Sequence, residues 1–175
     1  MRTLPEVRLV EVTADDMGHL RGWRNDPDTR RWFFDDLRSS PSMQIEWWQS
    51  YQVDDTDLLY TIRDTAGTPV GTIGLARIDH RHETAELGRC MIGPPQLRGR
   101  GYMTAAVLTL CKLAFNDMGL RRLSLKVFAD NALAIAVYER CGFCVERRLL
   151  WQRGVDDAAR DVLLMALRAE EFSDG

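Results

Sequence analysis

Lysine and long apolar runs are what this sequence most clearly lacks. Only Lys112 and Lys126 are lysines, so arginine supplies nearly all of the positive charge. The formal net charge is −3 and the pI is about 5.6, which argues against a protein that coats nucleic acid. No apolar run reaches the ~18 residues of a transmembrane helix, and Met1–Glu6 lack the apolar block of a signal peptide. We therefore expect a cytoplasmic protein with no membrane or nucleic-acid partner.

Cysteine is present at four positions, and none of them indicates a redox or metal role. Cys90 and Cys111 stand inside apolar patterns, as buried thiols do. Cys141 and Cys144 have the C-x-x-C spacing that redox and metal sites use. A second ligand pair is missing, and so is the strand–turn–helix context of a redox motif. We expect a protein with no bound metal.

Hydrophobic periodicity predicts a single α/β domain over residues 1–175, with no repeat, low-complexity tract or linker. Strands are expected at residues 6–12, 58–63, 70–78, 84–92, 122–129, 143–152 and 159–167. Helices are expected at residues 14–25, 41–51, 102–118 and 131–140, with an irregular segment at 28–40. The long helix joins strand 84–92 to strand 122–129, and a crossover of this βαβ type implies a parallel pair. The middle strands can pair as antiparallel hairpins, so the sheet is mixed.

The segment Arg98–Met103 reads Arg-Gly-Arg-Gly-Tyr-Met and lies just before the long helix. Glycine lets the backbone turn sharply and approach a ligand closely. The helix that follows presents free N–H groups and the positive end of its dipole. The segment therefore suits a phosphate or pyrophosphate, although an ordinary Arg-Gly loop explains it equally well when it is considered alone.

A second pattern lies downstream, Asp130-Asn-Ala-Leu-Ala-Ile-Ala-Val-Tyr-Glu-Arg-Cys-Gly-Phe143. Together the two segments resemble the GNAT superfamily of N-acetyltransferases, with its R/Q-x-x-G-x-G/A loop and a later asparagine, alanine, tyrosine and Gly-Phe. The resemblance covers roughly residues 58–168 and implies a mostly antiparallel seven-stranded sheet, a splayed parallel pair and about four helices. Met103 stands where the family has Gly or Ala. Its side chain can enter the core while its N–H faces the phosphate.

The resemblance also implies acetyl-CoA as the co-substrate and gives residues roles in binding it. The N–H groups of Gly99–Met103 would hold the pyrophosphate, and the two loop arginines would add charge. Strand 84–92 would bond the pantetheine arm, and so would Asn131, which is also explained as a helix cap. Tyr138 would protonate the leaving thiolate, unless it is only a core tyrosine. The implied cofactor-binding set is Met91, Ile92, Arg98, Gly99, Arg100, Gly101, Tyr102, Met103, Asn131 and Tyr138.

Acyl transfer to an amine needs a base, because a protonated amine is no nucleophile. Glu86 resembles the glutamate of histone-acetylating members. Its rivals are Glu83, His80 and His82. The two histidines lack a third metal ligand and should lie in a polar turn. A backbone N–H near Met91 or Ile92 would stabilise the oxyanion, and the predicted catalytic side chains are Glu86 and Tyr138.

The N-terminal half should decide which amine is acetylated. Trp23–Asn25, the aromatic run 32–34 and Glu46–Trp48 resemble the branch that acetylates amino groups of nucleotide-linked sugars. Aromatic rings can stack on a base or a sugar, and an arginine can meet a phosphate. The same aromatic helix could instead pack in the core and against a partner chain. The predicted acceptor-binding residues are Arg24, Asn25, Trp32, Trp47 and Glu86.

Other acceptors and a non-catalytic role stay open. A protein N-terminal amine, as in the ribosomal-protein acetyltransferases, is the close rival, and an aminoglycoside or polyamine would favour a strongly acidic groove. Candidates for such a groove are Asp35, Asp36, Asp54, Asp55 and Asp57. An acyl-CoA-binding accessory module is the alternative that is not an enzyme. The expected partner is a small-molecule amine, with a homodimer as an open alternative.

Overall fold

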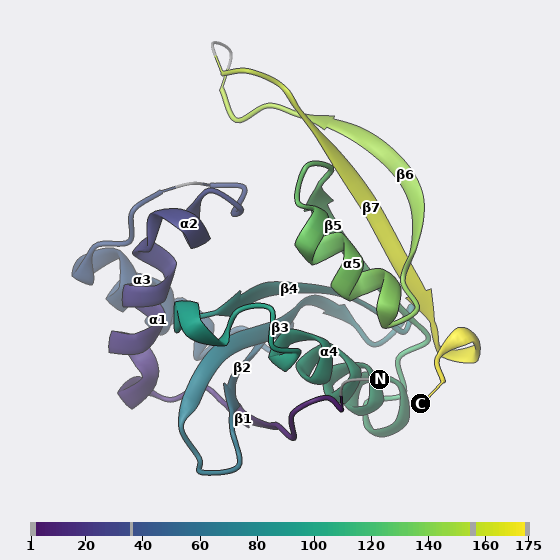
Figure 1. Ribbon diagram of the computed structural model, residues 1–175, viewed down its shortest axis with the longest axis horizontal. Helices are drawn as coiled ribbons and strands as arrows, with labels where there is room; N and C mark the ends of the chain where they lie inside the picture. Colours follow the sequence, from purple (N-terminus) through teal and green to yellow (C-terminus); the bar gives the residue numbers. More distant parts are fainter. Residues whose placement is uncertain (1–2, 36, 155–156, 174–175) are drawn as a thin grey trace.

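The computed structural model describes residues 3–35, 37–154 and 157–173. Its strands form one seven-stranded sheet in the order β1-β2-β3-β4-β5-β7-β6 (Figure 1). The strands are β1 (Arg8–Glu11), β2 (Leu58–Arg63), β3 (Pro69–Asp79), β4 (Thr84–Ile92), β5 (Arg122–Phe128), β6 (Cys144–Trp151) and β7 (Arg160–Arg168). The helices are α1 (Met17–Asn25), α2 (Pro27–Arg30), α3 (Pro41–Tyr51), α4 (Tyr102–Lys112) and α5 (Ala132–Arg140). Both the strand order and the helix positions confirm the fold class predicted from the sequence.

Two apolar clusters cover opposite faces of the sheet. Ile62 of β2 belongs to the larger cluster together with Leu110 of α4 and residues of α5. Leu59 of β2 belongs to the smaller cluster together with Leu20 of α1 and Tyr51 of α3. Because successive side chains of a strand point to opposite faces, α4 and α5 lie on one face and α1 and α3 on the other. In the described residues, no helix has the length and apolar character of a membrane span.

β4 and β5 form the parallel pair, and they stay together over only a short distance. Thr84–Glu86 of β4 pairs with Arg122–Ser124 of β5. All other neighbouring strands are antiparallel. Within the described chain, the rest of β4, including Met91 and Ile92, has no partner on β5. The two strands therefore splay apart, as predicted, and leave backbone groups of β4 available to another molecule.

A β-bulge interrupts β4 inside the splayed region. Thr72 of β3 faces Met91, whereas Gly74 faces Gly88, so β4 has one extra residue between these two pairs. Arg89 lies in this stretch and has a φ of 51°, in the left-handed region that few residues with a side chain adopt. Bulges change the direction of nearby groups and are common beside active sites.

The segment predicted to be irregular, residues 28–40, begins with a helical turn. α2 has Pro27 at its first position, where the missing N–H costs nothing. The amide of Thr29 donates to the carbonyl of Asp26 at 3.0 Å, and the Thr29 hydroxyl donates to the Asp26 carboxylate at 3.0 Å. The local signal for a helix start is therefore present, but it is too short to stand out as a periodic pattern.

The long helix also differs in its last turn from the prediction of a regular helix over 102–118. α4 ends at Lys112, and Leu113–Asp117 continues as a π-helix. The amide of Met118 donates to the carbonyl of Leu113 at 3.0 Å, which is the wider spacing of a π turn. The apolar stripe is the same in both forms, so side-chain periodicity does not distinguish them.

Candidate active site

The loop before α4 has the backbone shape of an anion site. Gly99 and Gly101 have φ values of 72° and 92°, which residues with a Cβ rarely adopt. The first amide that donates within α4 is that of Ala105, at 3.0 Å from the Gly101 carbonyl. The amides of Tyr102 and Met103 therefore lack an intrahelical acceptor, while the Met103 side chain packs against the larger cluster as predicted. Free amides at a dipole's positive end fit a pyrophosphate such as that of acetyl-CoA.

The arginine side chains of this loop contact the protein itself. Arg98 donates to the Asp26 carboxylate at 2.6 Å and to the Ile92 carbonyl at 3.2 Å, so it ties the end of β4 to the start of α2. The bond from Arg98 lowers the pKa of Asp26. Arg100 is exposed, and its Nε donates to the Gln96 carbonyl at 2.6 Å. A phosphate contact stays a prediction for both arginines, and for Arg98 it requires the guanidinium to leave these acceptors.

Two residues predicted to act on acetyl-CoA belong to α5 and its start: Asn131 is the N-cap residue, and Tyr138 lies in the helix. The Oδ1 atom of Asn131 caps the helix by accepting from the amide of Ala134 at 3.2 Å, a contact that does not use Nδ2. Tyr138 is only 8% exposed, and its hydroxyl lies near the Cys90 thiol on β4, which donates to the Gly88 carbonyl at 3.6 Å. Burial raises the pKa of Tyr138 well above its ordinary value, so the phenol keeps its proton. The structure thus places a proton donor beside the splayed part of β4.

An acidic pocket of about 360 Å³ lies between α3 and the start of β2. It is lined by Glu11, Trp48, Tyr51, Gln52, Asp54, Asp55, Asp57 and Leu58. Asp57 also forms an ion pair with Arg89 of β4, with 2.8 Å between Oδ2 and Nη1. Four carboxylates and two aromatic rings therefore surround one space that is connected through Asp57 to the bulge of β4.

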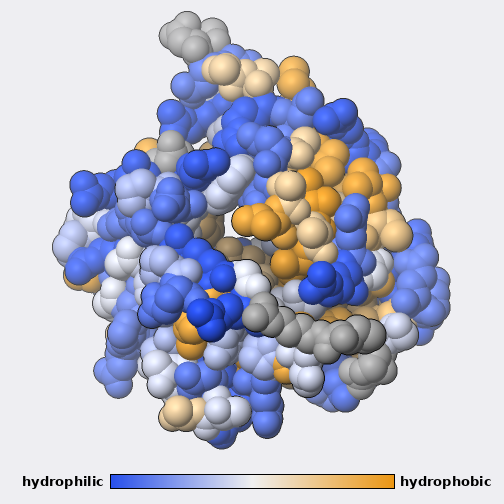
Figure 2. Space-filling view, viewed as in Figure 1, coloured by the Kyte–Doolittle hydropathy of each residue, from blue (hydrophilic) through white to orange (hydrophobic). Residues whose placement is uncertain are grey.

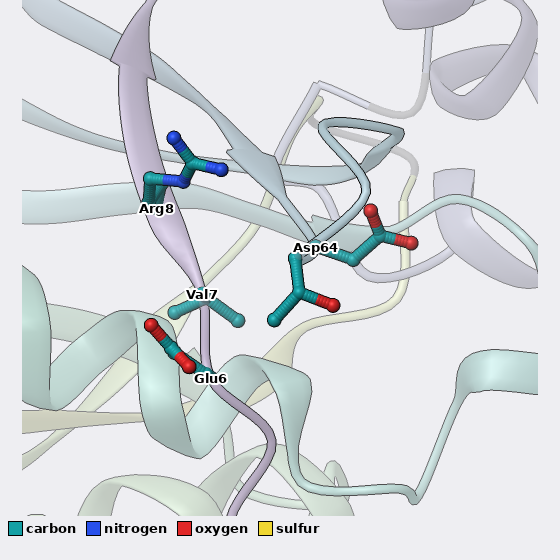
Figure 3. A pocket seen from close by; sticks show the side chains of 5 residues that line it. Glu6, Val7, Arg8 and Asp64 are labelled. Carbon is teal, nitrogen blue, oxygen red and sulfur yellow. The ribbon is translucent and has the colours of Figure 1, made fainter.

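A second pocket, of about 400 Å³, lies at the same edge of the sheet but at the other end of β1, between β1 and the turn that joins β2 to β3 (Figure 3). Its lining residues are Glu6, Val7, Arg8, Asp64 and Thr65. This pocket contains none of the residues predicted to bind acetyl-CoA or the acceptor. The acidic pocket also lacks these residues, but it contains Asp54, Asp55 and Asp57, which the sequence offers as candidates for an acidic groove, so it is the stronger candidate for an acceptor site.

Residues 6–144 match the family profile described as the acetyltransferase (GNAT) domain. The chain belongs to the GNAT acetyltransferases. It is therefore an N-acetyltransferase that uses acetyl-CoA, as the two sequence motifs imply.

Similar GNAT proteins include two spermidine N(1)-acetyltransferases. That of Vibrio cholerae serotype O1 is 21% identical over 167 residues, or 95% of each chain. That of Escherichia coli K12 is 22% identical over 172 residues, or 98% of this chain and 91% of the relative. The L-amino acid N-acetyltransferase AaaT of E. coli K12 is 30% identical over 108 residues, or 61% of this chain and 65% of the relative. The crystal structure of the V. cholerae spermidine N-acetyltransferase in complex with CoA and spermine shares the fold, with a TM-score of 0.86, 21% identity and coverage of 94% and 96%.

Glu86, the predicted GNAT base, lies at the point where β4 and β5 separate, opposite Ser124. Its carboxylate forms an ion pair with Arg77 and lies 3.9 Å from the ammonium of Lys126. Two cations therefore lie next to this carboxylate, and its role as the base stays a prediction. The rival His82 is bonded to the Asp79 carboxylate at 2.7 Å in an exposed turn.

Arg24 and Asn25, predicted to bind the acceptor, both have partners within the protein. Arg24 is ion-paired with Asp35, and its guanidinium lies 3.9 Å from the ring centre of Phe33. The Asn25 amide donates to the Ser39 carbonyl at 2.8 Å and accepts from the Ser39 amide at 2.7 Å. Asn25 therefore holds the segment before α3 against the end of α1, and an acceptor contact by either residue stays a prediction.

All three aromatic residues of α3 contact the smaller cluster, and two of them, Trp48 and Tyr51, also line the acidic pocket. Trp47 packs against the smaller cluster and stacks on Tyr51, with 5.2 Å between ring centres. Trp48, one residue later, lines the acidic pocket. Sequence reasoning selected Trp47. The helix has apolar residues on two sides, so its pattern does not show which tryptophan faces an acceptor. The structure makes Trp48 the tryptophan that an acceptor in this pocket would meet.

A group of residues connects the two halves of the molecule, and sequence reasoning singled out only one of them, Phe34, as part of the aromatic run 32–34. The Phe34 ring lies 4.7 Å from that of Phe128 at the end of β5 and 5.5 Å from that of Trp151 at the end of β6. The guanidinium of Arg160 lies 3.5 Å from the Phe128 ring centre and 5.7 Å from that of Trp32. Figure 2 shows a hollow near the centre of this face, between the α1–α2 side and the α5 side. We call Phe34, Phe128, Trp151 and Arg160 the bridging cluster.

The described residues offer no ready place for a metal ion. No group of three or more His, Cys, Asp or Glu side chains within them could hold one. The four cysteines are all free thiols, and Cys141 is buried whereas Cys144 is exposed. The Cys141 thiol donates to the Thr104 carbonyl at 3.7 Å, which ties α5 to α4.

Proposed function

We propose that this enzyme acetylates a primary amine of a linear polyamine, the class that includes spermidine and spermine. The acidic pocket carries the proposal, because four carboxylates and two aromatic rings line it. Ammonium groups pair with carboxylates and are attracted to the faces of aromatic rings. The names of the V. cholerae and E. coli relatives support the same substrate class.

The position of the pocket supports acetyl transfer to a bound polyamine. Asp57 in the pocket pairs with Arg89, the residue before Cys90, and the Cys90 thiol meets the Tyr138 hydroxyl. One ammonium group held by the pocket would therefore lie beside the strand along which acetyl-CoA is expected to bind. A second amine of the same molecule would then reach the thioester, because a linear polyamine carries several amines along a flexible chain.

The nucleotide-linked amino sugar predicted from the sequence has weaker support. Arg24, the residue predicted to meet its phosphate, is neutralised by Asp35 and covered by Phe33. None of the relatives described above is named for a sugar nucleotide. Of the candidate acidic residues, Asp35 pairs with Arg24 instead of lining the pocket, and Asp36 lies outside the described residues. The acidic-groove alternative is therefore the one we adopt.

In the proposed reaction, the neutral amine attacks the thioester carbonyl, a C–N bond forms and the C–S bond breaks. Glu86 would accept the amine proton, directly or through water, after its contact with Arg77 loosens. A backbone N–H of β4 near Met91 would stabilise the oxyanion. Tyr138 would give its proton to the leaving CoA thiolate, which its buried, protonated phenol is suited to do.

Release of CoA thiol from acetyl-CoA with a panel of amines tests the substrate class. The panel contains spermidine, an aminoglycoside, an amino-sugar nucleotide, a peptide with a free N-terminus and an L-amino acid. Spermidine should have the highest kcat/KM, by about 10-fold or more, because discrimination follows differential binding of the transition state. A higher kcat/KM for the sugar nucleotide or the peptide would overturn the proposal.

Replacing Asp54 and Asp55 by asparagine tests the pocket itself. Asparagine keeps the oxygen with which Asp54 accepts from the amide and hydroxyl of Thr56, but two charges disappear. The KM for spermidine should rise about 10-fold, with kcat changed less than about 3-fold, because the lost interaction binds substrate and transition state equally. The matched control is Asp117→Asn/Glu139→Gln, which removes two exposed charges elsewhere and should leave KM unchanged. Equal effects of both double variants would contradict a local role.

A further inference from the structure

Arg89 has an unusual backbone conformation in the splayed part of β4. Among the described residues other than glycine, only Arg77, Glu83 and Arg89 have positive φ values. Arg77 and Glu83 flank the exposed turn between β3 and β4, whereas Arg89 lies in the splayed part of β4. A left-handed conformation is unfavourable for a residue with a Cβ. The contacts of Arg89 must therefore offset the free energy that this backbone conformation costs.

Both the side chain and the backbone of Arg89 are held by other segments, the loop before β2 and strand β3. The guanidinium forms a bidentate ion pair with the Asp57 carboxylate, in which the distance between Nη1 and Oδ2 is 2.8 Å. It also donates to the Leu75 carbonyl at 3.3 Å. The Thr72 hydroxyl donates to the Arg89 carbonyl at 2.8 Å. The side chains of Arg89 and Asp57 are only 26% and 18% exposed, so water competes weakly for these bonds.

β3, the strand beside the bulge, has glycines at two positions where a side chain would collide with neighbouring main chain. A Cβ on Gly74 would lie 2.6 Å from the Leu58 carbonyl and 3.4 Å from Nη2 of Arg89. A Cβ on Gly71 would lie 2.2 Å from the Met91 carbonyl. Gly71 therefore permits a close approach of β4 just after the bulge, whereas Gly74 permits a close approach of β2.

The conformation of Arg89 sets the direction of the residues that follow it. Cys90 comes next, and its thiol meets the hydroxyl of Tyr138. Met91 follows with no partner on β5 among the described residues. A bulge that relaxed to a regular strand would turn these residues to the opposite faces and move their backbone N–H groups.

We propose that Asp57 and Arg89 are positioning residues for acetyl transfer. Their ion pair holds residue 89 in the left-handed conformation, and this conformation aims the N–H groups after it at the transferred carbonyl. The inference rests on the transfer site of the proposed function, but not on the identity of the acceptor. Asp57 would thus serve twice, as part of the acidic pocket and as the group that fixes the bulge.

Three substitutions of Arg89 separate the backbone conformation from the guanidinium. Arg89→Ala, Arg89→Asn and Arg89→Gly all remove the charge, but glycine and, less readily, asparagine accept a positive φ. Arg89→Ala should lower kcat about 30-fold or more, since misplacing one oxyanion donor has effects of this size. Arg89→Gly should keep kcat within about 3-fold of the parent, with asparagine intermediate. The dissociation constant of CoA should rise in the same order, most in Arg89→Ala and least in Arg89→Gly, because a relaxed bulge also moves Met91, which is expected to bond the pantetheine arm.

Asp57→Asn is a second test of the same ion pair, and it remains informative if Arg89→Ala does not fold. In the parent enzyme it should lower kcat about 5-fold or more, because the bulge loses its ion pair. In the Arg89→Gly background it should leave kcat unchanged, because glycine needs no ion pair to hold this φ. Any increase in the KM of the amine should appear in both backgrounds, since it reports the pocket.

All kcat values are measured with whichever amine of the panel reacts fastest, so a wrong substrate class leaves this test intact. Equal loss of kcat in Arg89→Ala and Arg89→Gly would overturn the inference, because the guanidinium itself would then be required. A further loss from Asp57→Asn in the Arg89→Gly background would overturn it as well.

Discussion

At the scale of single residues, Tyr138 shows how position gives an ordinary side chain a chemical task. It is buried between α5 and β4, its ring lies edge-on to Phe143 at 6.1 Å, and its hydroxyl meets the thiol of Cys90. A leaving thiolate that arrives in the same opening would find a phenol that is held in place and protonated. The expected role of Tyr138 as the acid can be tested without knowing the acceptor.

Tyr138→Phe should lower kcat by about 100-fold or more, a typical effect of losing a general acid. The dissociation constant of CoA should change little, because the hydroxyl acts on the leaving group. Steady-state kinetics and calorimetric titration with CoA measure the two quantities. Tyr60→Phe removes a half-buried hydroxyl on β2 and serves as the control. An unchanged kcat in Tyr138→Phe would remove the acid role.

The pKa of Tyr138 predicts how kcat depends on alkaline pH. Burial raises this pKa above the ordinary value of 10.0, and a raised pKa keeps the phenol protonated to higher pH. The acid form should therefore persist, and kcat should not decline between about pH 8 and about pH 10. A decline centred near the ordinary tyrosine pKa, absent from Tyr138→Phe, would contradict the buried position.

Side-chain partners are the part of the site that the sequence predicts least well. The glycines of the phosphate loop and the cap at Asn131 depend on local backbone shape, and they lie where the motifs predict. Arg98 instead bonds to Asp26, which is 72 positions away in the chain. Arg24 likewise pairs with Asp35, and Asn25 with Ser39. Residue type and spacing say nothing about such contacts, because the fold brings the partners together.

At the scale of elements, the start of α4 depends on the backbone freedom of its glycines. Gly101 is the N-cap residue with a φ of 92°. A Cβ there would also come within 3.1 Å of the Leu4 side chain. The shape of the predicted pyrophosphate site is therefore set by the path of the main chain, and a single methyl group should disturb it.

Gly101→Ala should weaken CoA binding about 10-fold or more and lower the free energy of unfolding by about 1–2 kcal/mol, the cost of a left-handed residue with a Cβ. Gly22→Ala on α1 is the control, since nothing lies within 4 Å of its Cβ position and alanine favours a helix. Titration with CoA and thermal unfolding measure both effects. Equal CoA affinity in the two variants would contradict the cradle.

The ion pair between Asp26 and Arg98 should give α2 a pH-dependent attachment to the end of β4. The bond from Arg98 lowers the pKa of Asp26 below 3.8, so its stabilisation is present above that pH and is lost as the pH falls through the lowered value. Asp26→Asn should lower the Tm by about 2–4 °C at neutral pH. The difference from the parent should vanish in acid, and a difference that persists there would contradict this origin.

Helices and strands are predicted well because their patterns are local. Alternation places all seven strands within a few residues of their observed ends, and the crossover predicts the parallel pair. The bulge at Arg89 escapes prediction, because it depends on Asp57 from the loop before β2 and on Thr72 from β3. The helical turn α2 and the π-helix at Leu113–Asp117 escape it because they are short or share the same apolar stripe.

At the scale of the whole molecule, the bridging cluster joins the N-terminal helices to the β6–β7 hairpin. Arg160 donates to the carbonyl of Arg31 at 3.3 Å and to the carboxylate of Asp130 at 2.9 Å, next to Asn131. The half of the molecule with the acidic pocket is thereby linked to the half with α5. A substrate that crosses from one half to the other would span the hollow between them (Figure 2).

Charge distribution at this scale favours a cationic acceptor over the sugar nucleotide that the aromatic segments first indicate. The formal net charge is only −3, yet four carboxylates gather at one pocket. Asp54, Asp55 and Asp57 stand close together in the sequence, but Glu11 joins them only through the pairing of β1 with β2. The sequence therefore shows part of the pocket, and folding completes it.

The KM for spermidine of Asp54→Asn/Asp55→Asn, compared with that of Asp117→Asn/Glu139→Gln, tests the central claim most directly. The pocket variant should show a KM raised about 10-fold and a nearly unchanged kcat, while the control matches the parent. An unchanged KM in the pocket variant, or a parent enzyme that releases no CoA thiol with spermidine, would contradict the claim that this pocket selects a polyamine.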